Sequence, residues 1–230
     1  MTTGQLSVLC KRFHGSPEYA RLAPMLVFAG LTALQGHLGK GSEYWGYLLK
    51  TVVGAWMVWK MRPRLEEMRW KISWEAAAVG VAVFALWVGL DGHYPRLARL
   101  QAGAGWNPPR HFGQGSALAW LYIVVRVAGS ALVVPPIEEV FYRSFLYRYL
   151  ANARFQAVPF NQFHARPFVV TAVLFGLAHP ERWLAAILCG LAYQGLALRK
   201  NRLGDAITAH AATNALLGTW VVCKGQWHYW

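Results

Sequence analysis

Long apolar stretches alternate with short polar or basic segments along the whole chain. A helix needs about 20 mostly apolar residues to cross the hydrocarbon core of a bilayer, so these stretches predict membrane-spanning helices. They lie at 22–38, 44–59, 74–90, 117–134, 137–150, 167–179, 181–198 and 203–222. The pattern predicts an all-α fold, a polytopic membrane bundle of seven or eight transmembrane helices, in a single integral-membrane domain over 1–230.

The pattern leaves open whether 117–134 and 137–150 are one span or two separate elements. The Pro-Pro pair at 135–136 lies between them, and proline inside a helix breaks or kinks it. One kinked span would place the basic segments 148–166 and 199–202 on the same side of the membrane. Since cytoplasmic loops carry an excess of Lys and Arg, this charge distribution favours the single span.

Composition supports membrane insertion and changes how the net charge is interpreted. Hydrophobic residues make up 56% of the 230 residues and charged residues only 14%, against about 25% in an average soluble domain. The formal net charge is +13, which in a soluble protein would suggest nucleic-acid binding. No basic run with interleaved aromatic residues is present. We therefore expect no nucleic-acid partner and attribute the charge to cytoplasmic loops and anionic lipid headgroups.

Basic residues also predict the orientation of the bundle. The segment 60–71 is densely basic and should be cytoplasmic. Lys11, Arg12 and Arg21 lie near the start of the chain, and no small-residue cleavage site is evident. We therefore expect an uncleaved N-terminus on the cytoplasmic side. The segment 91–115, which contains prolines and glycines, is then expected to be a loop on the outer face.

Two adjacent carboxylates, Glu138 and Glu139, lie between apolar runs and are followed by Arg143. Ionisable groups in such surroundings are costly, so they indicate a functional site. Glu139 and Arg143 are four residues apart and share a helix face, so they can form an ion pair. Glu138 is rotated by about 100° from Glu139 on a helix. It is then free to face a cavity, where a carboxylate can act as a general base that activates water.

Three further polar side chains lie in later apolar stretches. His179 ends one of them and could transfer a proton or hold a water molecule. His210 and Asn214 share a face of the last stretch and could donate hydrogen bonds to a developing oxyanion. Together with Glu138 they supply a base, a proton-transfer group and oxyanion donors, which is the inventory for adding water to an amide.

Each of these signals also has a structural interpretation. The segment 66–71 has nearly the same acidic pair with a following cation in a basic loop, so that pattern is weak by itself. A histidine such as His179 at the end of an apolar helix is often a hydrogen-bonded structural residue. His210 and Asn214 could equally form the interhelical hydrogen bonds that hold membrane bundles together.

A zinc site is the main mechanistic alternative. Glu138, His179, His210 and Asn214 could in principle be ligands, but no HExxH helix is present and asparagine is a poor zinc ligand. The cysteines are far apart and form no CxxC pair, which argues against a thiolate zinc site and a disulfide framework; they are Cys10, Cys189 and Cys223. We therefore expect no cofactor, with zinc as the alternative.

The order of three motifs resembles the CPBP family of intramembrane proteases. That family comprises the type II CAAX prenyl endopeptidases and the bacterial bacteriocin-processing and Abi proteins. The motifs are Glu-Glu-x-x-x-Arg at 138–143, Phe-x-x-x-His at 175–179 and His-x-x-x-Asn at 210–214. The resemblance covers roughly the C-terminal half, and the motifs are confined to about 117–222.

The resemblance implies an intramembrane protease whose site lies in a cavity open towards the cytosol. It implies that Glu138 is the base and that His179 assists it. It implies that His210 and Asn214 stabilise the oxyanion, and that Glu139 and Arg143 form a supporting ion pair. The small, Trp-rich chain is similar to the bacterial CAAX prenyl protease-related group, some of which accompany exosortase-type sorting systems. We therefore expect it in the bacterial inner (plasma) membrane.

We predict an endopeptidase that cleaves a peptide bond at or within the membrane. Its partners would be membrane lipid and a peptide or protein substrate, such as a prenylated C-terminus or a C-terminal sorting signal. The alternative is a non-catalytic membrane scaffold or immunity protein that kept the fold. A small transporter with a proton relay through Glu138, Arg126 and His179 is disfavoured, because no internal repeat is visible.

Overall fold

A computed structural model describes residues 15–97 and 106–230, which form helices and turns and no strand. The predicted all-α fold is confirmed, while the predictions on Cys10, Lys11 and Arg12 lie outside the described residues. The helices are α2 (Pro17–Leu34), α3 (Ser42–Met61), α4 (Trp74–Gly89), α5 (Pro108–Phe112), α6 (Ala117–Ala128), α7 (Val134–Glu139), α8 (Tyr147–Ala151), α9 (Ala165–Leu177), α10 (Trp183–Lys200) and α11 (Gly204–Lys224). Single 3₁₀ turns occur at η1 (Arg62–Arg64), η2 (Glu66–Met68), η5 (Phe155–Ala157) and η6 (Trp227–Tyr229).

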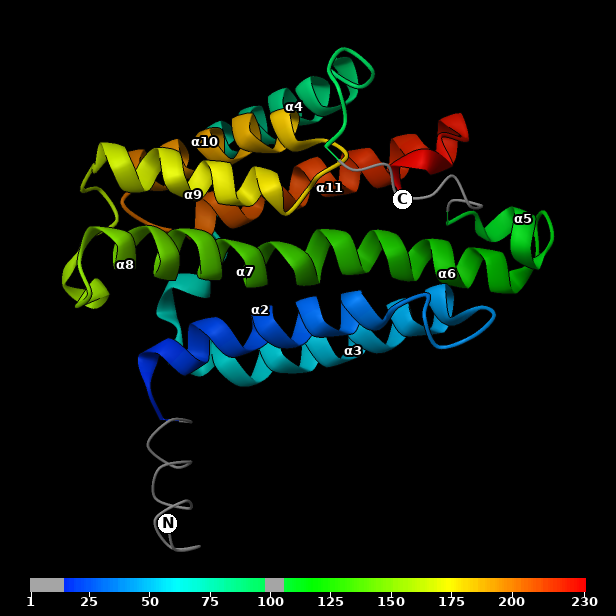
Figure 1. The fold of residues 1–230 in the computed structure, drawn as a ribbon, viewed down its shortest axis with the longest axis horizontal. Coiled ribbons are helices and arrows are strands. Elements are labelled where there is room, and N and C mark those ends of the chain that lie inside the picture. Colours follow the sequence, from blue (N-terminus) through cyan, green and yellow to red (C-terminus); the bar gives the residue numbers. More distant parts are fainter. Residues whose placement is uncertain (1–14, 98–105) are drawn as a thin grey trace, which may run out of the picture.

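The longest element is a continuous helical run that crosses the molecule (Figure 1). It comprises α6, the π-helical segment η3 (Gly129–Val133), α7, the π-helical segment η4 (Val140–Leu146) and α8. The helices α2 and α3 pair with each other on one side of this run, and α4, α9, α10 and α11 lie on the other side. Since α7 contacts α2, α3 and α11, the middle of the run is at the centre of the bundle.

The Pro-Pro pair does not interrupt this run, because the turn before it is π-helical. The Val134 N–H bonds to the carbonyl of Gly129, five residues back instead of four. A regular α-helix would press the rings of Pro135 and Pro136 against the preceding carbonyls, and the wider turn changes that spacing. The sequence left open one span or two elements here, and the structure has one continuous helix over Ala117–Ala151.

Among the described residues, two helices are long and apolar enough to cross a membrane. They are Ala117–Ala151, with 35 residues, and Gly204–Lys224, with 21 residues. Trp74–Gly89 and Ala165–Leu177 are apolar but shorter. The predicted count of seven or eight spans is therefore not confirmed by helix length and composition.

Apolar side chains cover much of the outer surface, whereas several charged side chains are buried. The exposed apolar residues on α3, α6 and α9 include Val52, Trp56, Trp59, Leu118, Trp120, Leu121, Val124, Val169, Val173 and Leu177. The buried charged residues include Arg21, Lys50, Glu139, Arg143 and Arg182. This distribution fits a bundle surrounded by lipid, in which ionisable groups face the interior.

The connections between helices gather at two opposite ends of the bundle (Figure 1). We call one the basic end; it contains the connections 62–73, 152–164 and 201–203, whose cations are Arg62, Arg64, Arg69, Lys71, Arg154 and Arg202. Its parts are joined by a 3.3 Å bond from the Lys71 N–H to the carbonyl of Gly204.

We call the other the mouth end, and it contains the connections 35–41, 90–97 and 178–182 and the tail 225–230. Its parts are joined by a 2.9 Å bond from the Trp183 Nε1–H to the carbonyl of Pro95.

The helices α4 and α11 approach closely at Gly80. A Cβ atom at this position would lie 2.8 Å from the backbone oxygen of Ala209 and 2.8 Å from the Cβ of Ala212. A side chain larger than hydrogen does not fit there unless one of the helices moves. Because α11 carries the His210 and Asn214 motif, this contact also positions the candidate site.

We expect Gly80→Ala to lower the melting temperature of the detergent-solubilised protein, because overpacking of this kind costs about 1–3 kcal/mol. Gly89→Ala is the matched control on the same helix, where no atom lies within 4 Å of the added Cβ. This control should be neutral or stabilising, since alanine is favoured over glycine in helices by about 0.5–1 kcal/mol. Equal melting temperatures for the two variants would contradict the close approach.

Candidate active site

Glu139 is fully buried and lies between two partners from different helices. Its Oε2 is 3.1 Å from the Nε of Arg143, so the expected ion pair is present. Its Oε1 is 2.9 Å from the Nδ1 of His210 on α11. A carboxylate accepts, so Nδ1 carries the hydrogen of this bond. Glu139 therefore compensates the positive charge of Arg143 and also orients the His210 ring.

Aromatic rings surround the Arg143 guanidinium. The ring centroid of Phe175 lies 4.6 Å from its Cζ, and those of Tyr142 and Tyr193 lie at 5.4 Å and 5.9 Å. Cation–π contacts of this kind stabilise a desolvated cation. The fixed positive charge is thus kept next to Glu139 in an otherwise apolar part of the core.

Glu138 points in a different direction from its neighbour, as the helical rotation predicts. Its side chain is 13% exposed, and its Oε2 lies 4.0 Å from the Nε2 of His210. His210 is therefore placed between the two carboxylates, with one ring nitrogen toward each. Its ring also stacks on Tyr193, with centroids 5.0 Å apart and an interplanar angle of 17°. This ring position brings the first and third sequence motifs together.

His179 lies in the turn after α9 and close to the same site. Its Nδ1 is 2.9 Å from the carbonyl oxygen of Phe175, four residues back. A carbonyl can only accept, so Nδ1 is the donor and Nε2 is left free in the neutral ring. The 90° contact with the Trp87 ring holds the imidazole edge-on at a centroid distance of 5.8 Å. His179 therefore presents Nε2 as its available atom.

Asn214 bonds to the long helix at the point where the prolines remove a donor. Its Nδ2 donates to the carbonyl of Ser130 at 2.8 Å. In the π-turn, where Val134 bonds to Gly129, the corresponding donor for Ser130 would be residue 135, a proline without an N–H. Asn214 supplies the missing donor and keeps its second N–H for another acceptor. Asn214 thus makes an interhelical hydrogen bond, as the structural interpretation of the sequence allowed, and it still has a donor for the oxyanion role.

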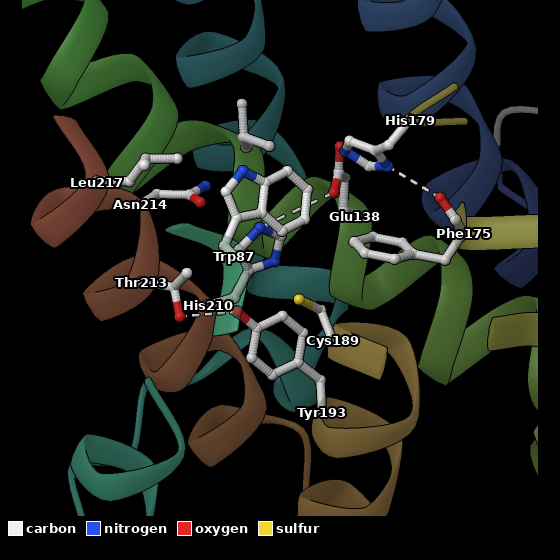
Figure 2. A pocket seen from close by; sticks show the side chains of 11 residues that line it. Trp87, Glu138, Phe175, His179, Cys189, Tyr193, His210, Thr213, Asn214 and Leu217 are labelled. Carbon is white, nitrogen blue, oxygen red and sulfur yellow. Dashed lines mark hydrogen bonds and ion pairs between the residues drawn. The ribbon is translucent and has the colours of Figure 1, made fainter. Parts of the chain in front are cut away.

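These side chains line a small recess that adjoins a larger cavity. The recess has a volume of about 90 Å³ and is lined by Glu138, His179, His210 and Asn214 together with Trp87, Val134, Phe175, Cys189, Tyr193, Thr213 and Leu217 (Figure 2). A water molecule needs roughly 10–15 Å³ of such space, so the recess has room for water beside a carbonyl group. Glu138, His179 and Asn214 also line a second cavity of about 680 Å³.

The larger cavity extends from the recess to the mouth end. Its wall includes Thr32 and Ala33 near the end of α2, the turn 178–182, and Tyr229 and Trp230 of the tail. No residue of the basic-end connections is among those lining either cavity in the described part of the chain. The candidate site is therefore reached from the mouth end.

Charged side chains hold the cavity wall together at the mouth end. Asp91 lies 3.6 Å from the Nε of Arg182 and 3.0 Å from the Nε2 of His228. Partial burial raises the pKa of the Asp91 carboxyl, but the His228 hydrogen bond and the Arg182 charge outweigh it, and the net pKa lies below its ordinary value. Burial and the neighbouring Asp91 raise the pKa of Tyr229 to about 12.

Sequence reasoning missed three residues of the recess. Trp87 is on α4, in the half of the chain without a motif, and Tyr193 is on α10 between the second and third motifs. Thr213 accepts a 2.8 Å hydrogen bond from the Tyr193 hydroxyl and donates toward the carbonyl of Gly80 at 2.9 Å. The only available signal was the position of Thr213 three residues after His210, which places both on one face of α11.

The donor set does not fit a zinc ion as the side chains lie here. Among residues 15–97 and 106–230, no group of three or more His, Cys, Asp or Glu side chains has the spacing to hold a metal. His210 uses Nδ1 for Glu139, and the amide of Asn214 is turned to a carbonyl. We therefore derive no step through a metal.

Comparison with known proteins finds a family model that matches the motif-bearing segment. The family model described as "Type II CAAX prenyl endopeptidase Rce1-like" matches residues 120–216. No curated protein and no solved structure matches the chain. The matched segment contains all three motifs, so the resemblance predicted from them is confirmed. It associates the chain with CAAX proteases, which are membrane-embedded hydrolases.

We expect Arg143→Met to be strongly destabilising, because it leaves the buried Glu139 carboxylate without its cation at a cost of about 3–5 kcal/mol. The double variant Glu139→Gln/Arg143→Met should be more stable than Arg143→Met alone, since the unpaired charge is removed. Thermal unfolding in detergent measures both. A double variant that is less stable than the single one would show that charge compensation is not what Arg143 provides.

Proposed function

We propose that this chain is an intramembrane endopeptidase that hydrolyses a peptide bond of a membrane-associated or lipidated substrate. The observation that carries the proposal is the position of Glu138 in a recess beside His179 and Asn214, while the adjacent Glu139 is neutralised. The Rce1-like match over residues 120–216 supports a protease of the CAAX type. Glu138 is the carboxylate that remains available for chemistry.

In the proposed reaction, Glu138 takes a proton from a water molecule in the recess, and the water oxygen attacks the scissile carbonyl carbon. The carbonyl oxygen becomes an oxyanion that accepts the second N–H of Asn214, and the Nε2–H of His210 when that nitrogen is protonated. The tetrahedral intermediate then loses its C–N bond, and the proton held by Glu138 passes to the leaving nitrogen. His179 holds the water through its free Nε2.

The remaining motif residues support this arrangement without touching the substrate. Glu139 fixes the ring of His210, and Arg143 compensates the charge of Glu139. The apolar walls of Val134, Phe175 and Leu217 keep bulk water out, which strengthens each electrostatic contact in the recess. The proposed mechanism needs no cofactor, and a zinc-dependent reaction is the alternative that the experiment below separates from it.

The proposed substrate is a peptide or protein held in the membrane, with a prenylated C-terminus or a C-terminal sorting signal as the candidate classes. The outer cavity is lined by apolar and aromatic side chains such as Met25, Phe28 and Trp87, which suits a lipid-soluble segment. We propose membrane lipid as the surroundings of the whole bundle, in seven or eight spans of a bacterial inner membrane. Helices shorter than the hydrocarbon core, such as Trp74–Gly89, would be accommodated by thinning of the bilayer.

We further propose that the basic end, together with the N-terminus, is cytoplasmic. Its connections carry the dense Lys and Arg segments 60–71 and 199–202, which the positive-inside bias places on that side. The cavity then opens to the opposite face, because its wall continues to the mouth end. This orientation differs from the cytosolic opening that the family resemblance implied, and it favours substrates that present their cleavage site on the outer face.

We expect Glu138→Gln to lower cleavage of membrane peptides by about 10²–10⁴-fold, since the base is removed, without loss of folding. Purified protein in detergent is assayed against prenylated and unprenylated peptides. The matched control is Glu66→Gln, which alters a side chain that is 84% exposed in the other acidic pair. Full activity of a folded Glu138→Gln protein would overturn the assignment of the base.

The same assay with a strong chelator separates the two mechanisms. Cleavage that survives chelation supports the metal-free reaction. Cleavage that is lost on chelation and restored by zinc would place Glu138 and the histidines in a metal site. If membrane peptides remain uncut while the site variants alter a cellular phenotype at equal expression, the chain acts as a binding scaffold instead.

We expect a cysteine at His37 to be labelled by a membrane-impermeant maleimide added to intact cells, because the mouth end faces outward. A cysteine at Glu66 should be labelled only after permeabilisation. Both positions are exposed, and the three native cysteines are first replaced by alanine. The reverse labelling pattern would place the cavity on the cytoplasmic side.

A further inference from the structure

Two cations on the wall of the larger cavity, one buried and one half-buried, lack a carboxylate partner. Lys50 on α3 is 5% exposed, and its Nζ bonds to the hydroxyl of Thr32 at 3.2 Å. Arg126 on α6 is held through its guanidinium face, at 4.5 Å from the ring centroid of Tyr47 and 5.1 Å from that of Trp106. In the described part of the chain, no Asp or Glu oxygen lies within 4.0 Å of either cation.

The other buried cations have partners that this pair lacks: Arg148 donates to two backbone carbonyls and a hydroxyl, and the remaining three have carboxylates. Arg21 pairs with Glu67, Arg143 with Glu139 and Arg182 with Asp91. A buried charge without a partner is costly, and an arginine cannot relieve that cost by losing its proton. Cation–π contacts orient a guanidinium but leave its net charge in place. A bound anion would supply the counter-charge that these two cations lack.

The two cations are neighbours around one aromatic ring. The Nζ of Lys50 lies 4.7 Å from the Tyr47 centroid, and the Cζ of Arg126 lies 4.5 Å from the same point. The Tyr47 hydroxyl also donates to the Arg126 carbonyl at 3.2 Å, which fixes the ring against α6. A ligand bound beside this ring is therefore close to both positive charges.

Both cations line the cavity of about 680 Å³ that leads to Glu138. Ser130 and Asn214 line the cavity wall between them and the recess. Arg126 and Glu138 are twelve residues apart on one helical run, or roughly 18 Å between their Cα atoms. Since an extended peptide spans at most about 3.3–3.6 Å per residue, a chain of about five residues covers this distance.

We propose that Lys50 and Arg126 form a cationic subsite that binds a carboxylate of the peptide substrate a few residues from the scissile bond. The carboxylate comes from a peptide C-terminus or from an acidic side chain, and the two cations supply the same charge-assisted hydrogen bonds to either. The assignment of this carboxylate to a substrate rests on the proposed function. The cations thereby set the register in which a peptide lies across Glu138.

The experiment measures binding, so it does not depend on cleavage. The Glu138→Gln protein in zwitterionic detergent is titrated with an N-acetylated pentapeptide of Leu and Ala by microscale thermophoresis. The peptide is used with a free C-terminal carboxylate, with a carboxamide, and as a carboxamide that carries one Asp at its last position. We expect both carboxylate peptides to bind about tenfold or more tightly than the uncharged one.

Variants assign this preference to the two cations. Lys50→Met and Arg126→Gln should each bring the affinity ratio of carboxylate to carboxamide peptide close to one, whereas Arg126→Lys should keep part of it. Lys60→Met is the matched control, because it removes an exposed cation from the same helix as Lys50. Melting temperatures confirm that each variant is folded.

A preference for the free C-terminus alone identifies a terminal carboxylate as the ligand, and equal binding of the Asp peptide extends the subsite to side chains. Equal affinity for all three peptides overturns the inference, as does a preference that both variants leave unchanged. If the protein binds carboxylate peptides more tightly but cleaves none of the peptides tested, the subsite is supported and the protease function is contradicted.

Discussion

The buried carboxylate of Glu139 is the interaction on which the rest of the site depends. It has no exposed surface, forms an ion pair with Arg143 from its own helical run and accepts a hydrogen bond from His210 on α11. An unpaired charge in these surroundings would cost several kcal/mol, so α7 and α11 are held in one register. Because Glu138 is the adjacent residue, this register also decides where the second carboxylate points. One member of the pair stabilises the structure and the other is left accessible in a cavity.

The proline pair provides a second constraint, and it acts on the same two helices. The π-turn before Pro135 leaves the carbonyl of Ser130 without a backbone donor, and Asn214 supplies one from α11. A local defect of the long helix is thus repaired by a side chain from another part of the chain. π-turns inside α-helices are frequent at functional sites, and here the turn leads directly into the helix that carries Glu138.

Sequence reasoning succeeded where the relevant interaction is local and failed where it joins distant segments. The all-α fold follows from apolar stretches, and the Glu139–Arg143 pair follows from a spacing of four residues. The bond from His210 to Glu139 spans 71 positions and has no local signature. Trp87 and Lys50 lie in the half of the chain without a motif, so only the packing of α3 and α4 brings them to the cavity.

Helix boundaries show the same limit on a smaller scale. The helix α2 begins at Pro17, before the first apolar stretch at 22–38, because the Ser16 side chain accepts a 3.1 Å hydrogen bond from the Tyr19 N–H. His179 lies two residues beyond Leu177, where α9 ends, and this turn is what frees its ring to face the recess. A hydropathy pattern predicts neither the Ser16 cap nor the turn that contains His179. The number of membrane spans depends on such ends and on the surrounding lipid, so composition alone does not determine it.

The size of the recess has a consequence for the physical state of any substrate. A space of about 90 Å³ cannot admit an α-helix, which is about 10 Å wide with its side chains. A peptide bond therefore reaches Glu138 only from an unwound stretch of chain. Unwinding in hydrocarbon leaves backbone N–H and C=O groups without partners at several kcal/mol each, whereas water near the mouth end can satisfy them. A protease of this shape would select its substrates by how readily their helix ends fray, in addition to the side chains that they carry.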